Sequence, residues 1–130
     1  EDTNIRCTFH APDNLKPVPI DQMRLREAIV NLLKNSYEAV GTSGAIDIYA
    51  YECSDSLCLD IKDSGCGMDP QTLDQLYTPF FTSKDKGNGL GLVITKSIIE
   101  AHGGSLTCQS MPKKGTTFTI SLPFELPVSS

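Results

Sequence analysis

The sequence lacks an excess of positive charge. Its 11 lysines and arginines are outnumbered by 16 acidic residues, so the net charge is −5 and the pI is about 4.8. A protein that binds mainly nucleic acid needs a basic face to neutralise phosphates, so the composition excludes nucleic acid as the main partner. A single nucleotide stays open, because it needs only a few placed donors and a metal ion.

Long apolar runs and paired cysteine motifs are also missing. No stretch approaches the ~18 apolar residues of a membrane span, and no signal-like segment is present. There is no CxxC motif, so we expect free thiols in a reducing cytosol and a cytoplasmic domain. The chain starts without methionine, so we expect a fragment whose parent protein can carry a membrane anchor elsewhere. The cysteines, which cannot all pair, are Cys7, Cys53, Cys58, Cys66 and Cys108.

The 130 residues suffice for one domain with a single apolar core, and no repeat divides them. Alternating apolar residues predict strands, and apolar residues at helical spacing predict helices. Asp21 as N-cap and Gly41 as a stop bound the longest helix. This order favours an α+β fold, with helices on one face of a mixed or antiparallel sheet. The expected elements are strand 3–10, helix 22–40, strands 45–51 and 57–63, helices 69–76 and 90–102, and strands 105–110 and 116–122.

The long helix has an unusual polar edge. Glu27, Asn31, Asn35 and Glu38 are spaced so that their side chains stack on one helical face. A solvated face is the ordinary explanation for such residues. Asparagine, however, is a mediocre helix former, and two of them here are one turn apart. An amide oxygen suits Mg²⁺, so Asn31 and Asn35 are candidate contacts of a metal ion.

Asp63 ends an apolar strand and is followed by Gly65 and Gly67. Glycines let a flat ring approach the backbone closely, and the carboxylate could accept a hydrogen bond from an exocyclic amine. A tight turn that needs a positive φ explains the glycines equally well. The segment is therefore a candidate site for a ring, with a simple turn as the alternative.

Gly87, Gly89 and Gly91 alternate directly before a helix. The free N–H groups of a helix start and the helix dipole suit a phosphate, and Lys84 and Lys86 lie just upstream. The spacing fits neither GxxxxGK[ST] nor GxGxxG, which excludes a Walker loop and the dinucleotide fingerprint. A flexible surface loop is the alternative to a phosphate site. Between the short helix and this loop, the run 79–84 carries two adjacent phenylalanines, for which a structural role and a ligand contact both stay open.

In this order, these segments resemble the boxes of the ATP-binding catalytic domain of bacterial sensor histidine kinases, nearest to the nitrogen-regulator-like type. The domain of these kinases belongs to a superfamily that also includes DNA gyrase, mismatch-repair ATPases and a heat-shock chaperone. The resemblance covers residues 20–123 and implies a two-layer α/β sandwich, a mixed sheet covered by about three helices, with an ATP lid loop. One catalytic domain would fill residues 1–130. The matching segments are 31–39, 63–68, 79–84, 87–92 and 115–118.

The resemblance also implies roles for single residues. Asn35 would bind the Mg²⁺ that bridges the ATP phosphates, and Asn31 would contact phosphate or a metal-bound water. Asp63 would read the adenine amine, and Lys84 would contact phosphate. The other implied contacts are Gly65 and Gly67 beside the adenine, Gly87, Gly89, Leu90 and Gly91 in the lid, and Thr116 or Thr117 acting through water.

Position 31 separates the reaction classes. ATP-hydrolysing relatives carry a glutamate there as general base, and the amide of Asn31 cannot take a proton. Transfer to a histidine needs less help, because neutral imidazole is already a nucleophile. The expected activity is therefore a protein histidine kinase, with Asn31 and Lys84 as catalytic candidates that position and neutralise charge. An ATPase and a serine-kinase anti-sigma factor of the same fold are the alternatives.

Neither histidine of the chain fits a phosphoacceptor. His102 resembles the usual end of the family's last helix, and His10 lies in a strand without the acid that should follow an acceptor. We therefore expect the acceptor on a separate dimerisation helix domain and a response regulator downstream. The isolated domain is expected to be a monomer.

Overall fold

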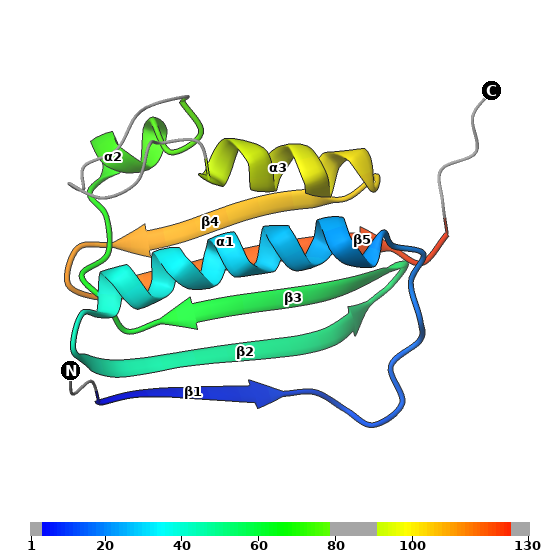
Figure 1. The fold of residues 1–130 in the computed structure, drawn as a ribbon, viewed down its shortest axis with the longest axis horizontal. Helices are drawn as coiled ribbons and strands as arrows, with labels where there is room; N and C mark the ends of the chain where they lie inside the picture. Colours follow the sequence, from blue (N-terminus) through cyan, green and yellow to red (C-terminus); the bar gives the residue numbers. More distant parts are fainter. Residues whose placement is uncertain (1–3, 79–90, 126–130) are drawn as a thin grey trace.

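The computed structural model describes residues 4–78 and 91–125. The strands form one five-stranded sheet in the order β1-β2-β3-β5-β4. β1 runs parallel to β2, and the other neighbours are antiparallel. The α+β class and the mixed sheet are confirmed (Figure 1). The elements are β1 (Asn4–His10), α1 (Gln22–Val40), β2 (Ser43–Cys53), β3 (Ser56–Asp63), α2 (Pro70–Asp74), α3 (Gly91–Ala101), β4 (Ser105–Met111) and β5 (Gly115–Pro123).

α1 has the bounds that its capping residues predict. The Asp21 carboxylate accepts a hydrogen bond from the Arg24 N–H at 3.1 Å, which satisfies a free donor of the first turn. Gly41, with φ of 81°, ends the helix, and its N–H donates to the Tyr37 carbonyl. The apolar stripe of α1 is buried against the sheet, with Leu32 fully enclosed.

The helices lie on one face of the sheet. α1 crosses in front of the strands and packs against α3, and α3 packs against β4 (Figure 1). α2 is shorter than predicted: it ends at Asp74, and residues 75–78 continue as turns. The core between the helices and the sheet is made of fully buried side chains, which include Leu32, Ile46, Ile61, Ile99 and Ile120.

Three neighbouring strands, β3, β5 and β4, place their helix-facing side chains in rows that run across the sheet. Residues in one row are register partners, and successive rows are two residues apart along each strand. Two rows are apolar and the third is polar, and the third is called the polar row below. The rows are Leu59, Ile120 and Leu106; then Ile61, Phe118 and Cys108; and last Asp63, Thr116 and Ser110.

All five cysteines are free thiols, as expected, and Cys53 and Cys58 share a sulfur–sulfur contact of 2.7 Å at the far end of the β2–β3 hairpin. Burial raises the pKa of Cys58 to about 11 and that of Cys108 to about 12. Across residues 4–78 and 91–125 there is no group of three or more His, Cys, Asp or Glu side chains fit for a metal ion. No helix in those ranges has the length and apolarity to span a membrane.

Candidate functional site

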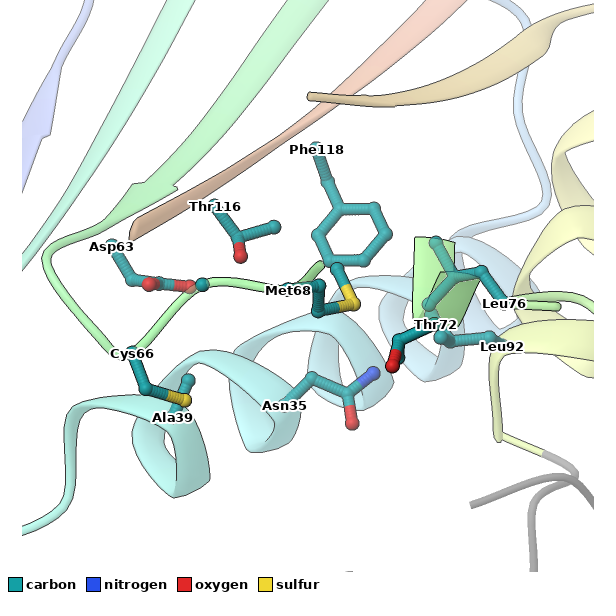
Figure 2. Close-up of a pocket in the computed structure, with 11 residues that line it drawn as sticks. Asn35, Ala39, Asp63, Cys66, Met68, Thr72, Leu76, Leu92, Thr116 and Phe118 are labelled. Atoms are coloured by element: carbon teal, nitrogen blue, oxygen red, sulfur yellow. The ribbon is translucent and has the colours of Figure 1, made fainter. Parts of the chain in front are cut away.

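A pocket of about 140 Å³ lies between α1 and the polar row (Figure 2). That volume is below the roughly 300–1,000 Å³ of sites for drug-sized ligands, so the described residues have room for only part of such a ligand, for example one ring system. Polar groups reach the pocket from α1, the end of β3 and the start of β5. Its apolar walls are formed by Ala39, Met68, Leu76, Leu92 and Phe118.

Asp63 is the charged residue among the described residues that line the pocket, and it is only 4% exposed. It ends β3, and its carboxylate accepts a hydrogen bond from the Gly65 N–H at 2.8 Å. A buried carboxylate is costly unless hydrogen bonds satisfy it, and this local turn supplies one of them. In Figure 2 the Asp63 and Thr116 side chains lie across the pocket from Asn35 on α1.

Thr116 continues the polar row, and its hydroxyl lies 2.8 Å from that of Ser110. Ser110 also accepts the Met68 N–H at 2.8 Å, so it ties the loop after β3 to β4. Thr117 points the other way. It pairs with Lys62 and Gln109, and alternation along β5 places it on the sheet face opposite α1 and α3. This face is called the uncovered face below, because none of the helices in the described ranges lies on it (Figure 1). Of the two predicted threonines, the structure brings only Thr116 to the pocket.

The loop after β3 is held on three sides. The Ser64 hydroxyl accepts the Ala45 N–H at 2.9 Å, at the start of β2. The Cys66 N–H donates to the Ala39 carbonyl at 3.2 Å, at the end of α1, and the Lys113 N–H donates to the Cys66 carbonyl at 2.6 Å. These three hydrogen bonds hold the floor of the pocket in place independently of any ligand.

Close packing and backbone conformation within the protein explain both glycines of this loop. A Cβ on Gly65 would stand 2.6 Å from the carbonyl carbon of Ala39, so close packing against α1 requires glycine there. Gly67 has φ of 71°, and a Cβ would also overlap the Met111 carbonyl oxygen. Gly67 lines the pocket, whereas Gly65 is not among the lining residues. The predicted reason, approach of a ring, is therefore not needed to explain either glycine.

The two asparagines of α1 lie in different surroundings. Asn35 is half-buried and lines the pocket. Asn31, one turn earlier, is not a lining residue, and its Nδ2 donates to the Gly91 carbonyl at 3.4 Å. The Thr95 hydroxyl donates to the same carbonyl at 2.8 Å. Asn31 thus joins α1 to the first residue of α3, at the end of the predicted lid.

The rest of the predicted lid lies outside the described residues. This holds for Lys84, Gly87, Gly89 and Leu90 and for the phenylalanine-bearing run 79–84. Their roles stay predictions.

α2 flanks the pocket through Thr72, a lining residue that the sequence analysis did not single out. Asp69 caps this helix: its carboxylate accepts the Thr72 N–H at 2.7 Å, and these hydrogen bonds lower the pKa of Asp69. Asp69 and Pro70 at the start of the helix are local sequence signals for it, but they do not predict that Thr72 lines the pocket. Ser110 was also missed, although counting back from Thr116 across the turn would have paired the two residues.

His102 has a structural position between the two long helices. Its Nε2 accepts the Asp21 N–H at 3.0 Å, which requires the proton on Nδ1, where the Ile98 carbonyl oxygen lies at 2.8 Å. Both ring nitrogens are therefore occupied within the fold. His10 stacks on Tyr49 with ring centroids 4.6 Å apart and contacts Asp47 at 3.2 Å, on the uncovered sheet face. Neither histidine faces the pocket.

A mixed sheet carries two long helices on one face, and Asn35 faces Asp63 and Thr116 across a small pocket between α1 and the sheet (Figure 2). Residues 20–126 match the family described as "Histidine kinase-, DNA gyrase B-, and HSP90-like ATPase". The chain belongs to this family.

Relatives and solved structures narrow the similarity to kinases. The sensor histidine kinase ZraS of Escherichia coli strain K12 is 38% identical over 122 residues, which are 94% of this chain and 26% of that protein. Sporulation kinase A of Bacillus subtilis strain 168 is 42% identical over 103 residues, 79% of this chain and 17% of that protein. The catalytic domain of the histidine kinase ThkA superposes with a TM-score of 0.82 at 32% identity, over 93% of this chain and 80% of that one. The chain thus spans about a quarter of ZraS.

Proposed function

We propose that the chain is a single catalytic domain that binds Mg-ATP and donates the γ-phosphoryl group to a histidine on a dimerisation helix domain of its parent protein. The observation that carries this proposal is the pairing of Asp63 and Thr116 at one end of the pocket with Asn35 across from them. The sensor kinases that the chain resembles support it. A response regulator that takes the phosphoryl group onward belongs to the same proposal.

The polar row is the proposed adenine end. Asp63 and Thr116 are both buried, at 4% and 6% exposure, so a ring that meets them is out of water. An amine on the ring can donate to the carboxylate, while Phe118, Met68 and Leu92 supply apolar contact. Buried polar groups of this kind discriminate strongly, because a ligand that cannot pair with them leaves them unsatisfied.

Asn35 is the proposed magnesium contact. Its side chain is half-buried and lines the pocket, so its amide oxygen can meet a ligand there. One neutral oxygen ligand fits Mg²⁺, which usually keeps several waters and takes its other ligands from phosphates. The bound ion would neutralise charge on the transferring phosphoryl group.

Asn31 and the lid residues set the proposed reaction class. Asn31 cannot act as a general base, and its amide instead holds the start of α3. Without a base for water, the domain favours an acceptor that is already nucleophilic, as neutral imidazole is. Lys84, Gly87, Gly89, Leu90 and Gly91 complete the proposal as the lid over the phosphates.

The first test is equilibrium binding of ADP and ATP to the purified chain, with and without Mg²⁺. Asp63→Asn keeps the shape but places a donor beside the ring, so affinity should fall roughly 10- to 100-fold, the value of a hydrogen bond to a charged group. Asn35→Ala should abolish the gain in affinity from Mg²⁺. Asn14→Ala, in the exposed connector, is the matched control. Unchanged binding in both site variants would show that these roles are wrongly assigned.

The second test separates kinase from ATPase. The full-length parent protein should acquire an acid-labile phosphoryl group from ATP. The isolated chain should transfer the γ-phosphoryl group of ATP to a separately supplied acceptor-helix domain. Steady release of phosphate without an acceptor, surviving Asn31→Ala, would favour an ATPase. Transfer to a serine of an antagonist protein would favour the anti-sigma factor.

A further inference from the structure

Two cysteines lie together at the turn end of the β2–β3 hairpin. Cys53 is the last residue of β2, and Cys58 lies near the start of β3. Their register partners are Ser56 and Tyr51, so the two cysteines are diagonal neighbours on the uncovered face. Their sulfur atoms are 2.7 Å apart. The remaining cysteines lie on β1, in the loop after β3 and on β4, so the two thiols form a local pair.

The turn beside this pair is anchored to two other segments. The Phe124 N–H, just after β5, donates to the Asp55 carbonyl in the turn at 3.0 Å. The Lys16 N–H, in the connector before α1, donates to the Glu52 carboxylate at 2.9 Å. The sulfur contact therefore belongs to a part of the hairpin that the rest of the fold holds in place.

The two thiols differ in exposure. Cys53 is exposed, so an oxidant in solution reaches it directly. Cys58 is only 6% exposed and lies between its register partners Tyr51 and Ser121. Burial, and then the hydrogen bond with Cys53, raise the pKa of Cys58 to about 11. The pair thus combines an accessible thiol with an enclosed thiol that keeps its proton near neutral pH, as an attacking and a resolving cysteine do.

The distance between the sulfur atoms decides what the pair can do. A disulfide bond is about 2.05 Å long, so small side-chain rotations bring the two sulfurs within bonding distance. Two thiolates on one tetrahedral zinc ion stand ~3.8 Å apart, because each Zn–S bond is about 2.3 Å. The two sulfurs are closer than that, and no group of three or more metal-ligating side chains forms across the described ranges. The geometry fits a disulfide better than a metal site.

We propose that Cys53 and Cys58 form a reversible oxidation site, which a hydroperoxide converts to a disulfide across the end of the hairpin. The Cys53 thiolate attacks one oxygen of hydrogen peroxide, the O–O bond breaks, hydroxide leaves and is protonated to water, and Cys53 becomes a sulfenic acid. The Cys58 sulfur then attacks the Cys53 sulfur. The S–S bond forms, the S–O bond breaks, and the leaving hydroxide takes the Cys58 proton as water. The two thiols lose two electrons, which the peroxide gains, and a dithiol reductant reverses the reaction by exchange.

This site is separate from the nucleotide pocket. Cys58 and Asp63 both lie on β3, and at ~3.3 Å per residue they are roughly 16 Å apart along the strand. Their side chains also point to opposite faces of the sheet. The inference therefore does not depend on the proposed function, and we expect the bridge to leave ADP affinity within about twofold of that of the reduced chain.

Oxidation of the purified chain by a small excess of hydrogen peroxide tests the proposal. The tryptic peptide 35–62 contains Cys53 and Cys58 and no other cysteine, so a bridge lowers its mass by about 2 Da, the mass of two hydrogens. Free thiols, counted under denaturing conditions, should fall by two from the initial five, and dithiothreitol should restore them. The rate should not depend on protein concentration, because the reaction is intramolecular.

Three variants identify the thiols involved. Cys58→Ser leaves Cys53 without a resolving thiol, so the peptide should gain about 16 Da for each oxygen added instead of losing about 2 Da. In Cys53→Ser the accessible thiol is gone, and Cys58 should stay reduced. Cys7→Ser removes an exposed cysteine on β1 and is the matched control, expected to form the bridge at the wild-type rate.

Two outcomes would overturn the proposal. The first is a wild-type peptide 35–62 that gains oxygen without forming the bridge. The second is a zinc ion bound in a one-to-one ratio to the wild type and lost in Cys53→Ser, because the pair would then be a metal site. ADP binding, measured on the same samples, keeps the two proposals apart. A chain that forms the bridge but never binds ADP would overturn the proposed function and support this inference.

Discussion

The second apolar row and the polar row lie on the same face of the same three strands, only two residues apart. Ile61, in the apolar row, is fully enclosed and packs in the core. Asp63, in the polar row, is almost as buried, at 4% exposure, yet it lines a pocket and needs hydrogen bonds. Nearly equal burial thus accompanies opposite chemistry. The strand register sets where a side chain points, and the residue type sets whether that place is core or site.

The transition between the rows also explains how the pocket keeps its shape. Phe118 belongs to the apolar row and to the pocket wall, so the core supports the site directly. The polar row is held by its own hydrogen bonds to the loop after β3 and to the β4–β5 turn. We therefore expect changes in the apolar row to act mainly on stability and changes in the polar row mainly on binding.

The largest expected effect comes from Ile61→Ala. Ile61 has no exposed surface, so the change removes buried methyl groups and leaves a cavity. The free energy of unfolding should fall by about 2–5 kcal/mol. Denaturant unfolding of the purified chain measures it, with Lys62→Ala on the uncovered face as control, expected to stay within about 0.5 kcal/mol. A loss of ADP binding in Ile61→Ala without a loss of stability would break the distinction between the rows.

Gly65→Ala should have the next largest effect, and on stability. A methyl group there would stand 2.6 Å from the Ala39 backbone, so α1 or the loop must shift. Overpacking of this kind costs about 1–3 kcal/mol. Gly91→Ala is the matched control, since the nearest atom to its added Cβ is the Asn31 Cγ at 4.0 Å. If Gly65→Ala instead kept full stability and lost nucleotide affinity, the ring-approach explanation of this glycine would be restored.

These glycines show where sequence reasoning stops. The helix bounds of α1 could be predicted because Asp21, the apolar stripe and Gly41 are local signals. The contact between Gly65 and Ala39 joins segments far apart in the chain, so no local pattern reports it. The local pattern offered two reasons for this glycine, approach of a ring and a tight turn, and its close packing on α1 became visible only with the tertiary structure.

The residues of the pocket also differ in whether the sequence alone predicts them. Asn35, Asp63 and Thr116 could be singled out from motif positions, and the fold brings all three to one pocket. Ser110 carries no motif signal, and its importance follows from the cross-strand register and from two backbone partners. Thr72 lies in a five-residue helix and lines the pocket, which no motif in the sequence indicates.

Alkaline pH should have a smaller effect on stability, and it should act through Cys108 in the second apolar row. Burial, and then the negative charge of Asp63, raise the pKa of Cys108 to about 12. Its folded-state pKa lies above the ordinary thiol value, so its contribution to stability is full below pH ~9 and is lost as pH rises toward ~12. The fall of Tm between these pH values should be shallower in Cys108→Ala than in the wild type. Leu106→Ala, which removes packing but no titrating group, should lower Tm without changing that slope.

The smallest expected effect is that of Thr117→Val, which tests the register itself. Thr117 is the neighbour of Thr116 with the same side chain, but it pairs with Lys62 and Gln109 on the uncovered face. We expect its ADP affinity to stay within about twofold of wild type and its stability within about 0.5 kcal/mol, because no pocket contact is lost. Thr116→Val, measured in parallel by the same binding assay, should weaken ADP. An equal loss in both variants would mean that β5 presents the opposite face to the ligand, and the assignment of the polar row would have to move by one residue.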